Sequence, residues 1–130
     1  MSEVRIATRW TDFDALGHVT HAAYPVYLDE ARDLYLRERV GDFGDWPYVI
    51  RHVSIDFERE IAHPTREVVV RTRVAEIGRS SVTFEQEVLA PDADDPAATA
   101  RAVVVAWDPA TRGSRAVGDD ARERILRAAQ

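Results

Sequence analysis

The sequence contains no cysteine and no lysine, and its one methionine is the first residue. Without cysteine the chain can have no disulfide, no thiolate metal ligand and no cysteine nucleophile. All 17 basic residues are arginine, and they are spread evenly along the chain, so we interpret the absence of lysine as a genomic composition bias. Long apolar runs are also missing, and no stretch approaches the roughly 20 residues that a membrane-spanning helix requires.

Acidic residues outnumber basic ones, 23 to 17. The 130 residues carry a net charge of −6 and no basic run, which argues against a nucleic-acid-binding surface. The first ten residues lack the apolar segment of a signal peptide. Apolar residues make up 45% of the chain, which is ordinary for a folded soluble protein. We therefore expect a single domain over residues 1–130, cytoplasmic, with neither a membrane nor a nucleic acid as partner.

One segment has clear helical periodicity. Its apolar residues recur every three or four positions, which predicts one apolar stripe made of Tyr24, Tyr27, Leu28, Ala31, Leu34 and Tyr35. We expect this helix to run from Thr20 or His21 to Arg39, with Arg32 among the polar residues of its surface. A proline fits only the first turn of a helix. Pro25 therefore leaves two options: the helix begins close to Tyr24, or Pro25 ends the first turn.

Alternation of apolar and polar residues predicts five strands, one before the helix and four after it. The first contains Val4, Ile6 and Trp10, and the others centre on residues 53–57, 68–74, 82–88 and 100–107. Asp120 and Glu123 form a plausible capping pair for a short C-terminal helix. This order predicts an α+β fold, in which an antiparallel sheet covers one face of the long helix.

The segment just before the helix carries the residues with the clearest chemical potential. Asp12 and Asp14 form a D-x-D step, and a loop with Gly17 and His18 follows. Free N–H groups at a helix N-terminus stabilise negative charge, so a carboxylate there can act beside a developing oxyanion. An aspartate in a glycine-containing loop is, however, more often a turn or cap residue. The residues alone leave both interpretations of Asp14 open.

This segment resembles the 4-hydroxybenzoyl-CoA thioesterase family of hot-dog-fold proteins. The family pattern reads approximately D-x-D-x-x-G-H-V-N-N-x-x-Y, with E-A-R further along the helix. Here it is matched from Asp12 to Val19, at Tyr24 and at residues 30–32, and the similarity extends to about Ala116. The sequence departs from the pattern at residues 20–21, where threonine and histidine replace two asparagines, and at Pro25.

The resemblance implies a hot-dog fold, with a five-stranded antiparallel sheet wrapped around one long helix and a short C-terminal helix. It also implies pairing of sheet edges in a homodimer or tetramer. The activity it implies is hydrolysis of an acyl-CoA thioester, with Asp14 as general base or nucleophile. Gly17 and His18 would then belong to the active-site loop, and the oxyanion amide would fall near His21.

For the coenzyme A portion of the substrate, the resemblance points to arginines. Arg79, beside the turn at Gly78, matches a basic position that contacts the nucleotide in family members, and Arg115 is a second candidate. No separate cofactor is expected, because coenzyme A is part of the substrate. The acyl group is not specified by the sequence.

Other interpretations stay open. The substrate could be an acyl-carrier-protein thioester, and the chain could be a non-catalytic acyl-CoA binder, which the altered residues 20–21 leave possible. A hot-dog hydratase has no supporting motif. The histidines at 18 and 21, taken with the D-x-D carboxylates, fit no recognised ligand spacing, so we expect no metal. No serine lies in the G-x-S-x-G context of a nucleophile elbow.

Overall fold

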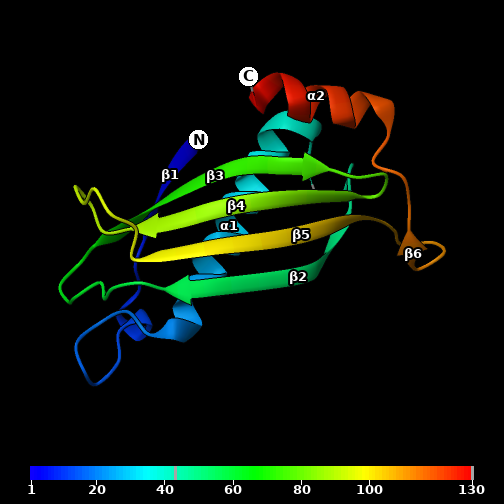
Figure 1. Cartoon of the computed structure of the whole chain (residues 1–130). Coiled ribbons are helices and arrows are strands. Elements are labelled where there is room, and N and C mark those ends of the chain that lie inside the picture. Colours follow the sequence, from blue (N-terminus) through cyan, green and yellow to red (C-terminus); the bar gives the residue numbers. More distant parts are fainter. Residues whose placement is uncertain (43, 130) are drawn as a thin grey trace.

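The computed structural model describes residues 1–42 and 44–129, and it consists of a curved antiparallel sheet, one long helix and a short C-terminal helix (Figure 1). The helices and strands in chain order are β1 (Ser2–Ala7), α1 (Tyr24–Val40), β2 (Tyr48–Phe57), β3 (Glu67–Ile77), β4 (Ser81–Leu89), β5 (Ala98–Asp108), β6 (Gly113–Ser114) and α2 (Asp119–Ala129). Two short 3-10 turns, Trp10–Asp12 and His21–Ala23, lie between β1 and α1. Within the described residues, no helix is both long and apolar enough to cross a membrane.

The main strands lie in the order β1-β3-β4-β5-β2, and every neighbouring pair is antiparallel. The two-residue β6 pairs with the end of β5. The sheet curls around α1, which lies on its concave face (Figure 1). This is the hot-dog fold that the sequence predicts, and its five main strands, long helix and short C-terminal helix are confirmed.

The first strand is shorter than its sequence pattern predicts. The alternation of Val4, Ile6 and Trp10 indicates a strand through Trp10, but β1 ends at Ala7. The ladder with β3 stops at the pair Ala7–Glu67, where β3 begins, so the residues that follow Ala7 have no strand partner. Trp10 instead opens a 3-10 turn, and 86% of its surface is exposed.

Helix α1 begins at Tyr24, which is the first of the two options that Pro25 leaves. Pro25 lies in the first turn, where the helix needs no N–H donor from it. The helix ends at Val40, and the Gly41 that follows has a φ of +115°, a conformation that residues with a side chain rarely adopt. The residues that it buries are Tyr24, Tyr27, Leu28, Ala31, Arg32, Tyr35 and Leu36.

Arg32 departs from the sequence interpretation, which places it on the polar surface of the helix. It is buried, and this burial lowers the pKa of its guanidinium, although the nearby Asp29 opposes the shift. Its Nη1 donates to Gln86 Oε1 of β4 at 2.8 Å, and Gln86 Nε2 donates in turn to the carbonyl of Leu28 and the hydroxyl of Thr72. A polar network therefore links α1 to the sheet inside the apolar core.

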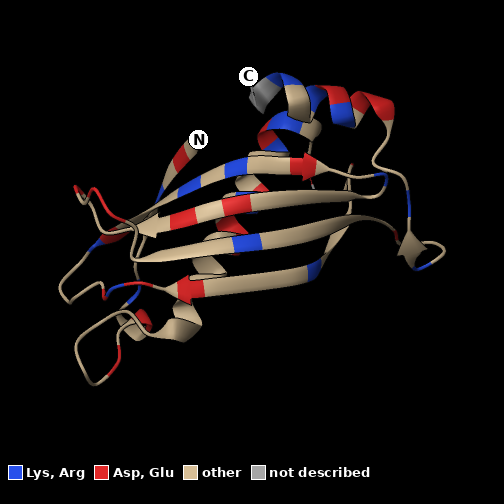
Figure 2. Cartoon of the chain, in the orientation of Figure 1, with Lys and Arg blue, Asp and Glu red and all other residues tan. Residues whose placement is uncertain are grey.

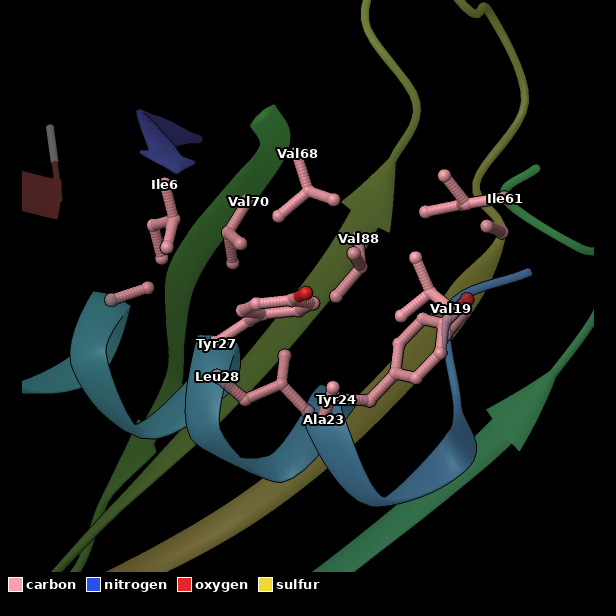
Figure 3. Packing of buried hydrophobic residues seen from close by; sticks show 13 residues of the cluster. Ile6, Val19, Ala23, Tyr24, Tyr27, Leu28, Ile61, Val68, Val70 and Val88 are labelled. Atoms are coloured by element: carbon pink, nitrogen blue, oxygen red, sulfur yellow. The ribbon is translucent and has the colours of Figure 1, made fainter. Parts of the chain in front are cut away.

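Two apolar clusters fill the space between α1 and the sheet. In the first, Tyr27 and Leu28 of α1 meet Ile6, Val70 and Val88, and Figure 3 shows these side chains between the helix and the strands. The second lies toward the other end of α1, where α2 packs, and includes Tyr35, Leu36, Phe84, Val104 and Ile125. Because α1 contributes to both clusters, its position along the sheet is fixed at two places.

The opposite face of the sheet is charged. Figure 2 shows residues of both signs along the strands and on α2. Arg101 of β5 pairs with Glu85 at 3.4 Å and with Glu76 at 3.8 Å, and Arg73 pairs with the same Glu85. Exposed pairs of this kind contribute little to stability. Their presence indicates that this face of the sheet is solvated.

A buried carboxylate ties the segment before α1 to the helix itself. Asp12 is 2% exposed, and its carboxylate accepts hydrogen bonds from the Tyr27 hydroxyl at 2.6 Å and from the Arg9 backbone N–H at 2.9 Å. The Arg9 guanidinium donates as well, from Nε and Nη2. Burial favours the neutral acid, but these hydrogen bonds outweigh it and lower the pKa of Asp12. Burial and the adjacent carboxylate raise the pKa of Tyr27, so its hydroxyl stays a donor.

Replacing Tyr27 by phenylalanine removes one donor from this buried carboxylate. We expect Tyr27→Phe to lower the free energy of unfolding at pH 7 by about 2 kcal/mol, the scale for a hydrogen bond to a charged group. Because the pKa of Asp12 is lowered in the folded state, its contribution is complete above its unfolded pKa of about 4 and is lost as the pH falls through the folded value. The difference between variant and wild type should therefore shrink in acid.

Urea denaturation at several pH values and one protein concentration measures this effect. Tyr35→Phe is the control, because it also removes a buried tyrosine hydroxyl, but the ring of Tyr35 lies under the Arg39 guanidinium rather than beside a carboxylate. A Tyr27→Phe loss that is the same at pH 7 and in strong acid would contradict the role assigned to Asp12.

Candidate active site

Two loops close against each other at one end of the sheet. The loop before α1 pairs with the loop between β2 and β3: Val19 N–H donates to the Ile61 carbonyl at 2.9 Å, and His63 N–H donates to the Gly17 carbonyl at 2.8 Å. Within the first loop, Gly17 N–H donates to the Asp14 carbonyl at 3.1 Å, which closes a turn. These backbone bonds hold the D-x-D segment against the end of β2.

The turn requires glycine at position 17. Gly17 has a φ of +80°, in the left-handed region, and a Cβ built there would meet no atom within 4 Å. Glycine is therefore required at this position by the backbone conformation, and not by crowding from neighbouring atoms. The contribution of Gly17 to the site is the backbone path that brings His18 back toward Asp14.

The Asp14 carboxylate is held by contacts to both oxygens. Its Oδ1 accepts from the backbone N–H of Leu16 at 2.9 Å and from that of His18 at 3.4 Å, which is the geometry of an Asx turn. Its Oδ2 lies 3.1 Å from His18 Nε2. The other ring nitrogen of His18, Nδ1, lies 3.0 Å from Glu60 Oε2. Asp14 thus has the turn role that its sequence context suggests and, in addition, a side-chain partner.

Asp14 and His18 line a hollow of about 290 Å³ that also borders the start of α1. His21 lines the same hollow and opens the 3-10 turn that runs directly into α1. Ala23 N–H donates to the Thr20 carbonyl at 3.0 Å and Tyr24 N–H donates to the His21 carbonyl, so neither is free. Pro25 has no N–H, which leaves the N–H groups of the turn that His21 opens to bind an oxyanion. The hollow therefore combines a carboxylate with backbone donors of the kind that thioester chemistry requires.

One wall of the hollow is aromatic. The ring of Phe57, at the end of β2, meets the ring of Tyr24 edge-on at a centroid distance of 5.2 Å and that of His21 at 6.4 Å. Phe57 is 53% exposed, although it is a large apolar residue. Val19 adds an aliphatic side chain to the same lining. This wall offers an apolar surface beside the polar groups.

Four of the residues predicted from the sequence, Asp14, Gly17, His18 and His21, lie together in one loop and helix start. The opposite wall, formed by residues 58–60 of the loop between β2 and β3, was not predicted from the sequence. Glu60 is 42 residues from His18 in the sequence, and no periodicity or motif links the two positions. Only the pairing of the two loops brings them together.

The two arginines expected to contact coenzyme A lie elsewhere in the chain. Arg79 belongs to the turn between β3 and β4, and its carbonyl accepts from Val117 N–H at 2.8 Å. Arg115 follows β6, and its Nε donates to the Trp107 carbonyl at 3.1 Å. In Figure 1, β6 and the turn between β3 and β4 lie at the opposite end of the sheet from the loop before α1. The 11 residues of β3 that separate the two ends span roughly 35 Å. Within one chain the structure does not bring the two arginines to the hollow.

Carboxylates and imidazoles also occur in metal sites. In the described residues, no three of these side chains are placed so that they could hold a metal ion. Around His18 the geometry explains why: the ring lies between Asp14 and Glu60, so the donor atoms point at one another and do not converge on a common centre.

Comparison with known proteins identifies the family. The model of the thioesterase-like superfamily matches residues 8–127, and the chain belongs to this superfamily. No protein of curated function matches the sequence. The family assignment agrees with the thioesterase expected from the D-x-D segment, at the level of the superfamily.

Solved structures show the same fold over nearly the whole chain. A protein of Pseudomonas aeruginosa is 28% identical with a TM-score of 0.90, over 100% of this chain and 92% of that one. A thioesterase from Thermus thermophilus, in complex with coenzyme A and Zn, is 30% identical with a TM-score of 0.86, over 98% and 92%. The DHNA-CoA thioesterase of Staphylococcus aureus is 18% identical with a TM-score of 0.85, over 98% and 89%, and shows the fold alone.

The turn at Gly17 can be tested by giving the residue a side chain. Gly17→Ala should lower the free energy of unfolding by about 1–2 kcal/mol, the cost of a left-handed conformation for a residue with a Cβ. Gly44→Ala is the matched control, because Gly44 also has open space around it but no positive φ, and it should cost less than Gly17→Ala. Thermal denaturation followed by circular dichroism measures both variants. Equal losses would show that the conformation at Gly17 is not the constraint.

Proposed function

We propose that the protein hydrolyses an acyl-CoA thioester to the free acid and coenzyme A, in the manner of the 4-hydroxybenzoyl-CoA thioesterase group. The observation that carries the proposal is the placement of the Asp14 carboxylate and the start of α1 around one hollow with an aromatic wall. Membership of the thioesterase-like superfamily supports the reaction type. The coenzyme A bound to the similar Thermus thermophilus thioesterase supports the class of substrate.

In this proposal each group around the hollow has a defined task. The thioester carbonyl oxygen accepts hydrogen bonds from N–H groups of the 3-10 turn before α1, at His21, which stabilise the charge that develops on it. Asp14 either takes a proton from an attacking water or attacks the carbonyl carbon itself. In the second route an anhydride forms, and water then cleaves it. In both routes the carbon–sulfur bond breaks, and the acid and the thiol are released.

We also propose that two copies of the chain pair through β2. This edge strand of ten residues has none that is buried, whereas each of β3, β4 and β5 buries several. Its apolar residues Ile50, Val53 and Phe57 are 42%, 39% and 53% exposed, and Val26 of α1 is 47% exposed. Open strand edges with exposed apolar residues require a partner. A second copy supplies both the strand and the apolar surface.

Such pairing has a consequence for coenzyme A. The Tyr48 end of β2 lies beside the turn between β3 and β4, since Tyr48 pairs with Ala106, whose N–H donates to the Ser80 carbonyl. The Phe57 end of β2 lies at the hollow. Antiparallel pairing of two β2 strands places the Arg79 end of one protomer alongside the Asp14 end of its partner. We propose that Arg79, and Arg115 near it, reach the substrate's phosphates across the dimer.

The catalytic role of Asp14 is tested by an isosteric substitution. Asp14→Asn keeps the shape of the side chain but can neither accept a proton from water nor attack as a carboxylate. We expect kcat for an acyl-CoA to fall by about a hundredfold or more, the scale for loss of a general base. Coenzyme A binding should persist, because an amide preserves the Asx turn. Thiol release followed with a thiol reagent measures turnover.

The control for this variant is Asp12→Asn. Asp12 is buried and bonded to Tyr27, and it does not line the hollow, so its loss should lower stability far more than turnover per folded molecule. If both variants lose turnover equally while folded, the D-x-D step shapes the loop and Asp14 has no special chemical role.

Dimer formation is tested at the exposed edge strand. The wild type should sediment as a particle of two chains at micromolar concentration, and Val53→Glu should prevent this by burying like charges in the interface. Leu126→Glu is the control, because Leu126 is 48% exposed on α2, away from β2, and the dimer should persist. A stable folded monomer of the wild type at micromolar concentration would contradict the proposal.

A further inference from the structure

We propose that Glu60 is a positioning residue for the reaction: it holds the His18 ring against Asp14, so that Asp14, His18 and Glu60 act as one hydrogen-bonded unit. This inference rests on the proposed function, because it gives the unit a task in thioester hydrolysis. Neither the sequence motif nor the family match assigns a role to Glu60. The contacts that define the unit are His18 Nε2 to Asp14 Oδ2 at 3.1 Å and His18 Nδ1 to Glu60 Oε2 at 3.0 Å.

The contact between His18 and Glu60 is built by the backbone and is not a chance meeting of long side chains. His18 and Ala62 form a bridge between the two loops, and hydrogen bonds on either side of it join Val19 to Ile61 and Gly17 to His63. Glu60 precedes this pairing directly. The backbone pairing therefore places the two residues opposite each other, whatever rotamers their side chains adopt.

The hydrogen bond between His18 and Glu60 sets how the ring is turned. An ionised carboxylate only accepts, so Glu60 Oε2 takes its hydrogen bond from His18 Nδ1. With Nδ1 turned toward Glu60, Nε2 faces Asp14 Oδ2. Glu60 therefore fixes which edge of the ring meets Asp14.

This arrangement fixes the reacting carboxylate. The terminal torsion of an aspartate is broad, so a free Asp14 could turn its oxygens through a wide range. Here Oδ1 is held by the loop N–H groups and Oδ2 by the ring. A carboxylate whose two oxygens are already held beside the hollow needs less reorganisation when the thioester binds. Glu60 thus acts on Asp14 through His18, as in other sites where a third group orients the partner of a base or nucleophile.

The other charged groups at the hollow do not take the place of Glu60. Glu58 and Arg59 line the same cavity, but Arg59 Nη1 donates to the Pro96 carbonyl at 2.8 Å.

The alternative role for Glu60 is that of an exposed ion pair without effect on turnover. Its side chain is 66% exposed, and pairs of this kind contribute at most about 1 kcal/mol. Its substitution should therefore leave the fold intact, and any effect on kcat is measured on a folded enzyme.

The test compares Glu60→Gln with Glu123→Gln. Glu123 is matched in exposure, at 67%, and is paired with Arg127 on α2. We expect Glu60→Gln to lower kcat for an acyl-CoA about tenfold with little change in KM, by analogy with the loss of a carboxylate that orients a metal-bound imidazole. Glu123→Gln should leave kcat unchanged. In a His18→Asn background, Glu60→Gln should cost nothing further, because Glu60 acts only through the ring.

A spectroscopic readout separates this inference from the proposed function. Nitrogen NMR of the histidine rings, with the His18 signals assigned from His18→Asn, should show a hydrogen-bonded Nδ1–H of His18 in the wild type and a changed signal in Glu60→Gln. An inactive wild type with this signature would contradict the proposed function and still support the hydrogen-bonded unit. Unchanged kcat and unchanged His18 signals in Glu60→Gln would overturn the inference, as would a loss of kcat that persists in the His18→Asn background.

Discussion

The buried carboxylate of Asp12 is the constraint on which the site depends. A charge removed from water is costly unless it is fully hydrogen-bonded, and Asp12 meets that condition with donors from Arg9 and from Tyr27 of α1. The bond to Tyr27 crosses from the loop to the helix, so it fixes the D-x-D step relative to the start of α1. The carbonyl of Asp12 adds a bond from Thr20 N–H at 2.7 Å, just before the helix begins. The position of Asp14 follows from this attachment.

The two aspartates of the D-x-D step therefore have different tasks, although they are only two residues apart. Asp12 faces the core and is satisfied within the fold, while Asp14 faces a hollow and meets His18. The 3-10 turn that ends at Asp12 gives way to extended backbone at Phe13, and this change of direction separates the two side chains. One side chain anchors the loop, and the other remains available to a substrate.

Local patterns predicted most of the fold, because helix and strand periodicity reflect which side of each element is buried. The start of α1 at Tyr24 is one of the two options that Pro25 leaves open in the sequence. The burial of Arg32 could not be predicted, since its partner Gln86 is 54 residues away on β4. Trp10 continues the alternating pattern of the first strand, but the pairing of β1 with β3 stops at Ala7, so Trp10 lies outside the strand. Asp14, Gly17, His18 and His21 were found together because one short loop contains them, whereas Glu60 depended on the pairing of two distant loops.

The central claim is that this hollow catalyses hydrolysis and does not merely bind an acyl-CoA. Both oxygens of Asp14 already have partners, which is compatible with a catalytic carboxylate held in place and also with a purely structural one. Incubation of the purified wild type with a panel of acyl-CoAs, with thiol and free acid measured together, distinguishes the two. We predict equimolar release of coenzyme A and acid from at least one member of the panel. Binding of acyl-CoAs with no release from any of them would contradict it and would make the protein a non-catalytic member of its superfamily.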